Sequence, residues 1–186
     1  DAELERAVDL LRQKNPAAIL TGNLGFLQWR KEFDVPVLLD YSVNVWNDLD
    51  TLFFQKYEAT PLVSPELSMD EMVKLQNKDV VVFCHGDLIL MNAMIEVKDK
   101  RLLNEKGASF PVRKEDAYWQ ILNSRPFGLF NDIRTLRDAG FSQFLIDKAG
   151  QGARLTALYR DLLDHEMPDR RLRKGHTSGH LYRPLP

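Results

Sequence analysis

The apolar run from Val80 to Phe83 restricts the fold of this chain more than any other stretch. The run is rich in β-branched residues, shows no alternation of apolar and polar positions, and is too short for a helix. These properties are typical of a strand buried on both faces, as in parallel sheets. The run ends in Cys84-His85-Gly86. Because parallel sheets bind ligands beyond the carboxyl ends of their strands, this polar group is a candidate for function.

The same arrangement recurs along the chain. Glu3 to Lys14 shows helical periodicity, and further helix-like segments separate short apolar runs. An alternation of short strands and helices predicts a parallel sheet with right-handed crossovers. Six apolar runs each end in a polar residue: Thr21, Asp40, Ser64, His85, Asn123 and Asp147.

The number of strands sets the expected architecture. A closed (β/α)₈ barrel needs eight strands and usually about 250 residues, whereas this chain has 186 residues. We therefore predict an α/β fold in the form of a partial or incomplete (β/α) TIM-barrel-like domain with about six parallel strands. A complete six-stranded doubly wound sheet is the alternative. No glycine-rich phosphate loop follows any of the runs, so a nucleotide-binding fold is not favoured.

Two local motifs refine this prediction. Leu102-Leu103 and Phe110-Pro-Val112 flank a turn at Gly107, which predicts a β-hairpin insertion at about 95–114. Ser68 and Glu71 have the spacing of a capping box at the start of a helix. We expect one barrel-like domain over residues 1–168 and a polar tail over residues 169–186.

Charge and cysteine content limit the partners and the compartment. The net charge is −2, which favours neither nucleic acid nor a membrane surface. Only the basic stretch from Arg170 to Lys174 would suit a nucleic acid. The single cysteine, Cys84, forms no internal disulfide, and no apolar run is long enough to span a membrane. We therefore expect a cytoplasmic protein that does not bind membranes.

Several segments resemble the peptidase U32 family, also called collagenase-like proteases. The resemblance extends from about Ala17 to Arg183 and implies the C-terminal part of the barrel-like U32 domain, without its N-terminal strands. Members of this family are described as peptidases or as oxygen-independent hydroxylases that modify RNA or quinone precursors. The segments that carry the resemblance are Asp40-Tyr-Ser-Val-Asn-Val-Trp-Asn47, Val63-Ser-Pro-Glu-Leu67, His85-Gly86, Phe110-Pro-Val112, Ile121-Leu-Asn-Ser124 and Gly175-His-Thr-Ser-Gly-His180.

The resemblance also bears on cofactors. The hydroxylases of the family hold a [4Fe–4S] cluster with four cysteines, the first of which would fall between Leu88 and Ile95. This chain has no cysteine there. Because Cys84 alone cannot supply four thiolate ligands, we expect no iron–sulfur cluster within this chain.

Polar residues at the predicted strand ends supply the candidate site. Asp40, Glu66, His85 and Asn123 are the candidate catalytic residues, since carboxylate, imidazole and amide groups suit acid–base work or metal binding. Structural roles are the alternatives: Asp40 would cap a helix, and His85 would bond to a loop. The candidate substrate-binding residues are Asn44, Asn47, Arg125, Asp147, His180 and Arg183.

Two further chemistries are weaker candidates. Neighbouring residues of a strand point to opposite faces, so Cys84 and His85 do not readily form a nucleophile–base pair, and Cys84 is interpreted as a small buried apolar residue. His176 and His180 are four residues apart, but the glycines around them disfavour a helix. Together with His85 they are the histidines that we consider as metal ligands.

These observations lead to three functional hypotheses. The first is an enzyme: a U32-type peptidase or hydrolase that acts on a peptide or small molecule at the C-terminal rim of the barrel strands. The second is a non-catalytic binding or assembly module, whose exposed sheet edges need a partner chain or a missing N-terminal segment to complete the barrel. The third is a component of a hydroxylase that modifies RNA or a quinone precursor.

Overall fold

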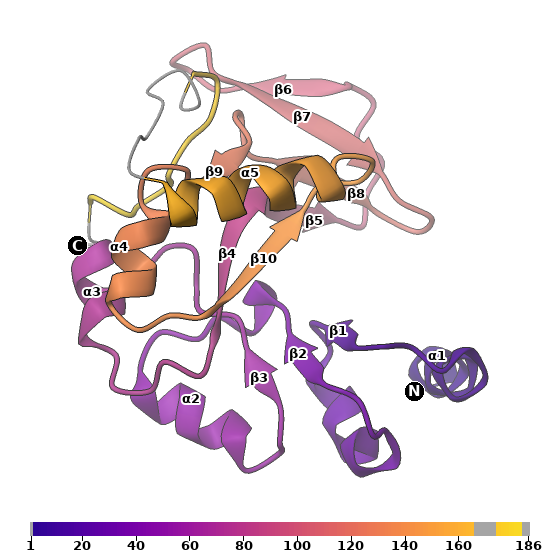
Figure 1. Cartoon of the computed structure of the whole chain (residues 1–186). Helices are drawn as coiled ribbons and strands as arrows, with labels where there is room; N and C mark the ends of the chain where they lie inside the picture. The colour runs from indigo at the N-terminus through magenta and orange to yellow at the C-terminus, as the bar shows by residue number, and fades with distance from the viewer. Residues whose placement is uncertain (1, 166–173, 184–186) are drawn as a thin grey trace. The chain divides into compact units, whose positions relative to one another are not determined.

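The computed structural model describes residues 2–165 and 174–183, and the chain divides into two compact units (Figure 1). The first unit comprises residues 1–83, 135–145 and 180–186. The second unit comprises residues 84–134 and 146–179. Most of the basic stretch, from Arg170 to Arg173, and the predicted boundary between residues 168 and 169 lie outside the described residues.

The first unit contains a small parallel sheet in the order β1-β2-β3. Ile19 pairs with Val37, and Leu38 pairs with Thr60, so the three strands run in the same direction as predicted. The elements before strand β4 are α1 (Ala2–Lys14), β1 (Ile19–Thr21), the 3₁₀ helix η1 (Leu24–Glu32), β2 (Val37–Leu39), the 3₁₀ helix η2 (Tyr41–Val43), α2 (Asp48–Gln55), β3 (Thr60–Pro61) and α3 (Met69–Lys74).

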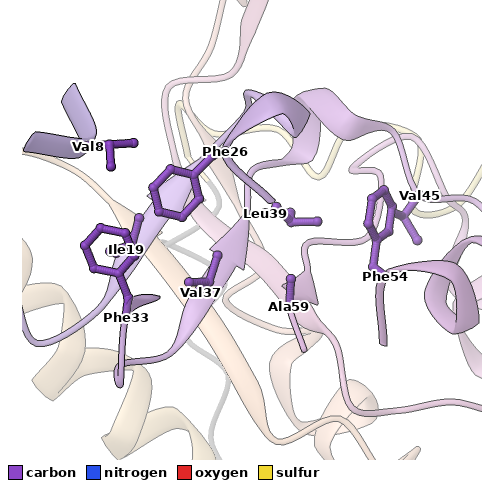
Figure 2. Close-up of a cluster of buried hydrophobic side chains, with 9 residues drawn as sticks. All are labelled: Val8, Ile19, Phe26, Phe33, Val37, Leu39, Val45, Phe54 and Ala59. Carbon is purple, nitrogen blue, oxygen red and sulfur yellow. The ribbon is translucent and has the colours of Figure 1, made fainter. Parts of the chain in front are cut away.

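The core of the first unit lies around this sheet (Figure 2). Val8 reaches the core from the apolar face of α1 and is 1% exposed. The rings of Phe26 and Phe33 pack with their centroids 5.5 Å apart. Burial of such side chains supplies most of the free energy that holds small elements together. The cluster consists of Val8, Ile19, Phe26, Phe33, Val37, Leu39, Val45, Phe54 and Ala59.

The predicted capping box is confirmed at the start of α3. The hydroxyl of Ser68 accepts a hydrogen bond from the backbone N–H of Glu71 at 3.3 Å. The carboxylate of Glu71 in turn accepts from the backbone N–H of Ser68 at 2.8 Å. This exchange satisfies two donors that a helix start otherwise leaves unpaired.

Three elements pass from one unit into the other. These are β4 (Val81–Gly86), α4 (Ile133–Asp138) and β10 (Gln143–Asp147). All six residues of β4 are buried, as the apolar run predicts. The sheet order around this strand is β10-β4-β9.

The second unit is built on an antiparallel sheet in the order β5-β8-β7-β6 (Figure 1). Strands β6 and β7 form the hairpin that the sequence places in this region, and Gly107 in its turn has a φ of 75°, which glycine tolerates best. The elements of the unit are β5 (Ile89–Ala93), β6 (Arg101–Leu103), β7 (Ser109–Lys114), β8 (Trp119–Leu122), β9 (Phe127–Gly128) and α5 (Gly152–Asp164).

The prediction of a barrel-like domain with about six parallel strands is wrong. The described residues form three small sheets, of three, three and four strands, and none of these sheets closes into a barrel. Trp119–Leu122, predicted as a parallel strand, pairs antiparallel with both β5 and β7. The physical reason is that the chain continues beyond Gly86 into a new strand, β5, which pairs with β8.

The structure also bears on membrane association. Among the helices of residues 2–165 and 174–183, none is both long enough and apolar enough to cross a bilayer.

Candidate functional site

A polar pocket of about 480 Å³ lies in the second unit. We call it the arginine pocket, because the lining residues within 2–165 and 174–183 include two arginines and no acidic side chain. Its other polar groups are hydroxyls and one amide. The residues that line it are Arg101, Ala108, Ser109, Asn123, Ser124, Arg125 and Thr177.

The β6–β7 hairpin supplies one wall of the arginine pocket. Leu103 pairs with Ser109 across the two strands, which brings Ser109 towards Arg101. The Nε of Arg101 donates a hydrogen bond to Oγ of Ser109 at 2.6 Å. This bond holds the guanidinium of Arg101 in one orientation through its Nε atom. The two terminal nitrogens of the group have no partner among the described residues. Those nitrogens are available to a ligand.

The segment after β8 supplies a second wall. The backbone N–H of Asn123 donates to the carbonyl of Leu88 at 2.8 Å, which anchors the segment. The side-chain oxygen of Asn123 accepts from the N–H of Ser124 at 2.9 Å, so its amide nitrogen is the group left to donate. Arg125 is exposed and forms no ion pair with a described residue.

Thr177 closes the pocket from the C-terminal part of the unit. Its backbone N–H donates to the carbonyl of Pro126, and its carbonyl accepts from the N–H of Gly128, both at 2.9 Å. Its hydroxyl oxygen accepts from the N–H of Gly179 at 3.1 Å. The backbone of Thr177 is therefore held on both sides, and its hydroxyl proton is free to be donated to a ligand.

The residue before Thr177 belongs to a group of four rings: His85, Phe130, Tyr159 and His176. We call this group the ring cluster. Phe130 stacks on Tyr159 with centroids 5.3 Å apart, and the His85 and His176 centroids are 5.2 Å apart. The Nδ1 atom of His176 is buried and has no hydrogen-bond partner among the described residues. The pocket and the ring cluster thus adjoin through consecutive residues.

Burial decides the protonation of the groups around the ring cluster. Burial first, and then the nearby His176 and Lys148, lower the pKa of His85 to about 4, while Asp87 opposes this shift. Burial raises the pKa of the Cys84 thiol to about 12. Burial also raises the pKa of the Tyr159 hydroxyl. At neutral pH the structure therefore holds a neutral imidazole at His85, a thiol at Cys84 and a phenol at Tyr159.

The four predicted catalytic residues are divided between the units. Asp40 and Glu66 belong to the first unit, and His85 and Asn123 belong to the second. Asp40 caps η2, where its side chain accepts from the N–H of Ser42 at 2.7 Å. His85 lies in the ring cluster and Asn123 in the arginine pocket. A catalytic role for these residues stays a prediction.

The predicted substrate-binding residues have varied environments. Asn44 accepts a hydrogen bond from Nε1 of Trp46, and Asn47 caps α2 by accepting from the N–H of Asp50. Asp147 is exposed at the end of β10. His180 and Arg183 belong to the first unit and are exposed. Of the six predicted residues, Arg125 is the one that lines the arginine pocket.

The histidines do not form a recognisable metal site. His85 and His176 are in ring contact, but the described residues contain no group of three or more side chains that could hold a metal ion. His180 belongs to the other unit. A metal role for these histidines stays a prediction.

Sequence reasoning did not select most residues of this region. Thr177 lies inside the segment Gly175 to His180, which carries part of the family resemblance and in which the histidines alone are predicted site residues. Tyr159 lies buried on α5, and no functional role is predicted for it from the sequence. Arg101 and Ser109 fell in the hairpin insertion, for which no function was predicted. No pattern in the sequence links this hairpin to Thr177.

Comparisons with known proteins add no relative. No family model matches the chain, and neither a curated protein nor a solved structure matches it. Membership of the U32 family stays a prediction. The TIM-barrel description is corrected by the three open sheets, and neither the comparisons nor the fold supports the terms peptidase and hydrolase.

Proposed function

We propose that the second unit is a binding module for a small anionic ligand that carries a carboxylate or a phosphate group. The observation that carries this proposal is the composition of the arginine pocket, whose lining among the described residues includes two guanidinium groups and no acidic side chain. Two positive charges in one pocket favour a ligand of opposite charge.

The chemistry of the lining supports an oxyanion in particular. A guanidinium binds carboxylate or phosphate through two parallel N–H···O bonds, which gives both strength and orientation. Arg101 is already oriented by its bond to Ser109. The amide of Asn123 and the hydroxyl of Thr177 add neutral donors on other sides of the pocket. A volume of about 480 Å³ suits a metabolite-sized ligand.

The protonation states favour binding over covalent catalysis. The nucleophile of a cysteine enzyme is the thiolate, and a thiol with a pKa of about 12 supplies very little of it at neutral pH. An imidazole with a pKa of about 4 is a weak general base at neutral pH. The part of the pocket lining that the structure describes includes no carboxylate that could replace it. The proposed binding module belongs to the same class as the second functional hypothesis, a non-catalytic module. Its site is the arginine pocket and not an exposed sheet edge.

The proposal is tested by titration calorimetry of the whole chain with inorganic phosphate and, separately, with succinate, each at constant ionic strength. We expect saturable binding of at least one of the two anions with one site per chain. Arg125→Gln is expected to weaken this binding about tenfold or more, because a hydrogen bond to a charged group contributes roughly 1.5–3 kcal/mol. The preferred anion separates a carboxylate ligand from a phosphate ligand.

A matched control distinguishes this site from general charge effects. Lys106 lies in the turn of the same hairpin and does not line the pocket, so Lys106→Gln makes the same change in net charge. We expect Lys106→Gln to bind like the unaltered chain. Equal weakening by Lys106→Gln and Arg125→Gln, or no saturable binding of either anion, would contradict the proposal.

A further inference from the structure

The oriented polar side chains of the arginine pocket are left as hydrogen-bond donors. Guanidinium groups donate and cannot accept, so Arg101 and Arg125 offer only N–H groups. Oγ of Ser109 accepts from Arg101, and Oγ1 of Thr177 accepts from a backbone N–H, so each hydroxyl has its proton to donate. The side-chain oxygen of Asn123 is likewise occupied, which leaves its nitrogen to donate. A ligand group made only of acceptor atoms therefore fits this lining.

These donors reach the pocket from three separate segments of the second unit. The β6–β7 hairpin supplies Arg101 and Ser109. The segment after β8 supplies Asn123 and Arg125, and the chain beyond α5 supplies Thr177. A carboxylate is planar and presents two oxygens, whereas a phosphoryl group presents three strong acceptor oxygens in a tetrahedral arrangement. The tetrahedral group is the one that accepts from three segments at once.

Charge and volume favour the same group. A phosphomonoester carries close to two negative charges at neutral pH, which matches the two guanidinium groups. A dicarboxylate carries the same charge but divides it between two planar groups. The volume of about 480 Å³ leaves room for an organic group beside the phosphoryl group. None of the described lining residues is aromatic, so the lining offers no ring on which a nucleobase could stack.

We propose that the ligand of the arginine pocket is a phosphomonoester of a small, non-aromatic molecule, of the class of sugar and polyol phosphates. This inference rests on the proposed function, because it names the class of anion that the same pocket binds. The phosphoryl group lies between Arg101 and Arg125 and accepts a hydrogen bond from the hydroxyl of Thr177. The organic group occupies the remaining volume of the pocket.

Titration calorimetry of the whole chain with glycerol phosphate and with succinate, at pH 7.5 and constant ionic strength, tests the proposal. We expect glycerol phosphate to bind about tenfold or more tightly than succinate, because it accepts additional charge-assisted hydrogen bonds. Tighter binding of succinate would overturn this proposal and leave the anion-binding function in place. Binding of neither anion would overturn both.

The pH dependence of binding identifies the phosphoryl group independently. The second pKa of a phosphomonoester is about 6, so its dianion is lost as the pH falls from 7.5 to 5. Sulfate is also tetrahedral but keeps both charges over this range. Because arginine side chains stay charged as well, sulfate reports changes elsewhere in the protein, including at His176 next to Thr177.

We expect glycerol phosphate to lose affinity about threefold or more relative to sulfate between pH 7.5 and pH 5, since the monoanion has less charge to offer two arginines. A lining made of donors binds sulfate as well. The absence of sulfate binding, or parallel changes in affinity for the two anions, would overturn the proposal.

The hydroxyl of Thr177 tests the three-sided arrangement. Thr177→Val removes this hydroxyl and keeps the backbone bonds to Pro126 and Gly128, and Thr177→Ser restores the hydroxyl. We expect Thr177→Val to weaken the binding of glycerol phosphate about tenfold and Thr177→Ser to bind within about twofold of the unaltered chain. Ser178→Ala removes a hydroxyl from a residue that does not line the pocket, and it is expected to have no effect. Equal affinities of the valine and serine variants would overturn the proposal.

Discussion

The hydroxyl of Tyr159 donates a hydrogen bond of 2.8 Å to the backbone carbonyl of Cys84. The same carbonyl accepts a second bond, of 3.0 Å, from the N–H of Leu129. Tyr159 lies on α5, and Cys84 lies in the part of β4 that belongs to the second unit. This bond therefore ties the helix to the strand that also carries His85.

Tyr159→Phe is expected to destabilise the protein by about 1 kcal/mol. The substitution removes the buried hydroxyl, which bonds to the carbonyl of Cys84 and lies 3.4 Å from Nδ1 of His85. It keeps the ring and its stacking on Phe130, and Leu129 still satisfies the carbonyl of Cys84. Urea denaturation measures the change. Tyr118→Phe in the same unit is the control, with an expected change within about 0.5 kcal/mol. A loss equal to that of the control would show that the bond contributes little to stability.

The stability of the protein is expected to fall with decreasing pH because of His85. Its pKa is about 4 in the folded state and about 6.5 in the unfolded chain, so the unfolded chain binds the proton more readily. The contribution is complete above pH 6.5 and is lost as the pH falls towards 4. A pKa shift of this size corresponds to a change of about 3 kcal/mol in the free energy of unfolding. Urea denaturation at a series of pH values measures it.

His85→Phe separates this effect from the titration of carboxylates. Phenylalanine keeps a ring in the ring cluster and removes the titrating group, so we expect a shallower fall in stability between pH 6.5 and 4. The titratable groups that face His85 include His176, Lys148, Asp87 and the hydroxyl of Tyr159, and they are unchanged in this variant. His180→Gln, at an exposed position, is expected to keep the pH dependence of the unaltered chain. Identical slopes for all three proteins would contradict the assignment to His85.

The thiol of Cys84 is expected to be inert in the folded protein. It is fully buried, and its pKa of about 12 leaves about a thousandfold less thiolate at pH 8 than a thiol with the ordinary pKa near 8.5. Labelling with a thiol-reactive chromophore measures this reactivity. We expect one equivalent to react rapidly in denaturant and essentially none in buffer. Rapid labelling of the folded protein would restore a thiol nucleophile as a candidate.

Local patterns in the sequence predicted local structure well. The helical periodicity of Glu3 to Lys14 corresponds to α1, and the apolar run from Val80 corresponds to the buried strand β4. The helix depends on contacts between residues that are near in the sequence, and the buried strand depends on the apolar character of each of its residues. The sequence therefore contains the information needed to recognise them.

The pairing of strands was not predictable in the same way. Trp119–Leu122 has alternating burial, which suits parallel and antiparallel neighbours equally. Its direction is set by β5 and β7, which pair with it from either side. The arginine pocket depends on the same long-range pairing, because it needs β6, β7 and Thr177 to meet. Asn123 and Arg125 were identified because they follow an apolar run, whereas Arg101 follows none.

The capping box at the start of α3 gives a prediction for the first unit. Ser68→Ala is expected to destabilise the protein by about 1 kcal/mol, because it leaves the N–H of Glu71 without its acceptor. The helix is only six residues long, so the cap satisfies a large share of its end groups. Urea denaturation measures the change, and Ser142→Ala, at an exposed position of the same unit, is the control. Equal stability of the two variants would show that water replaces the cap at little cost.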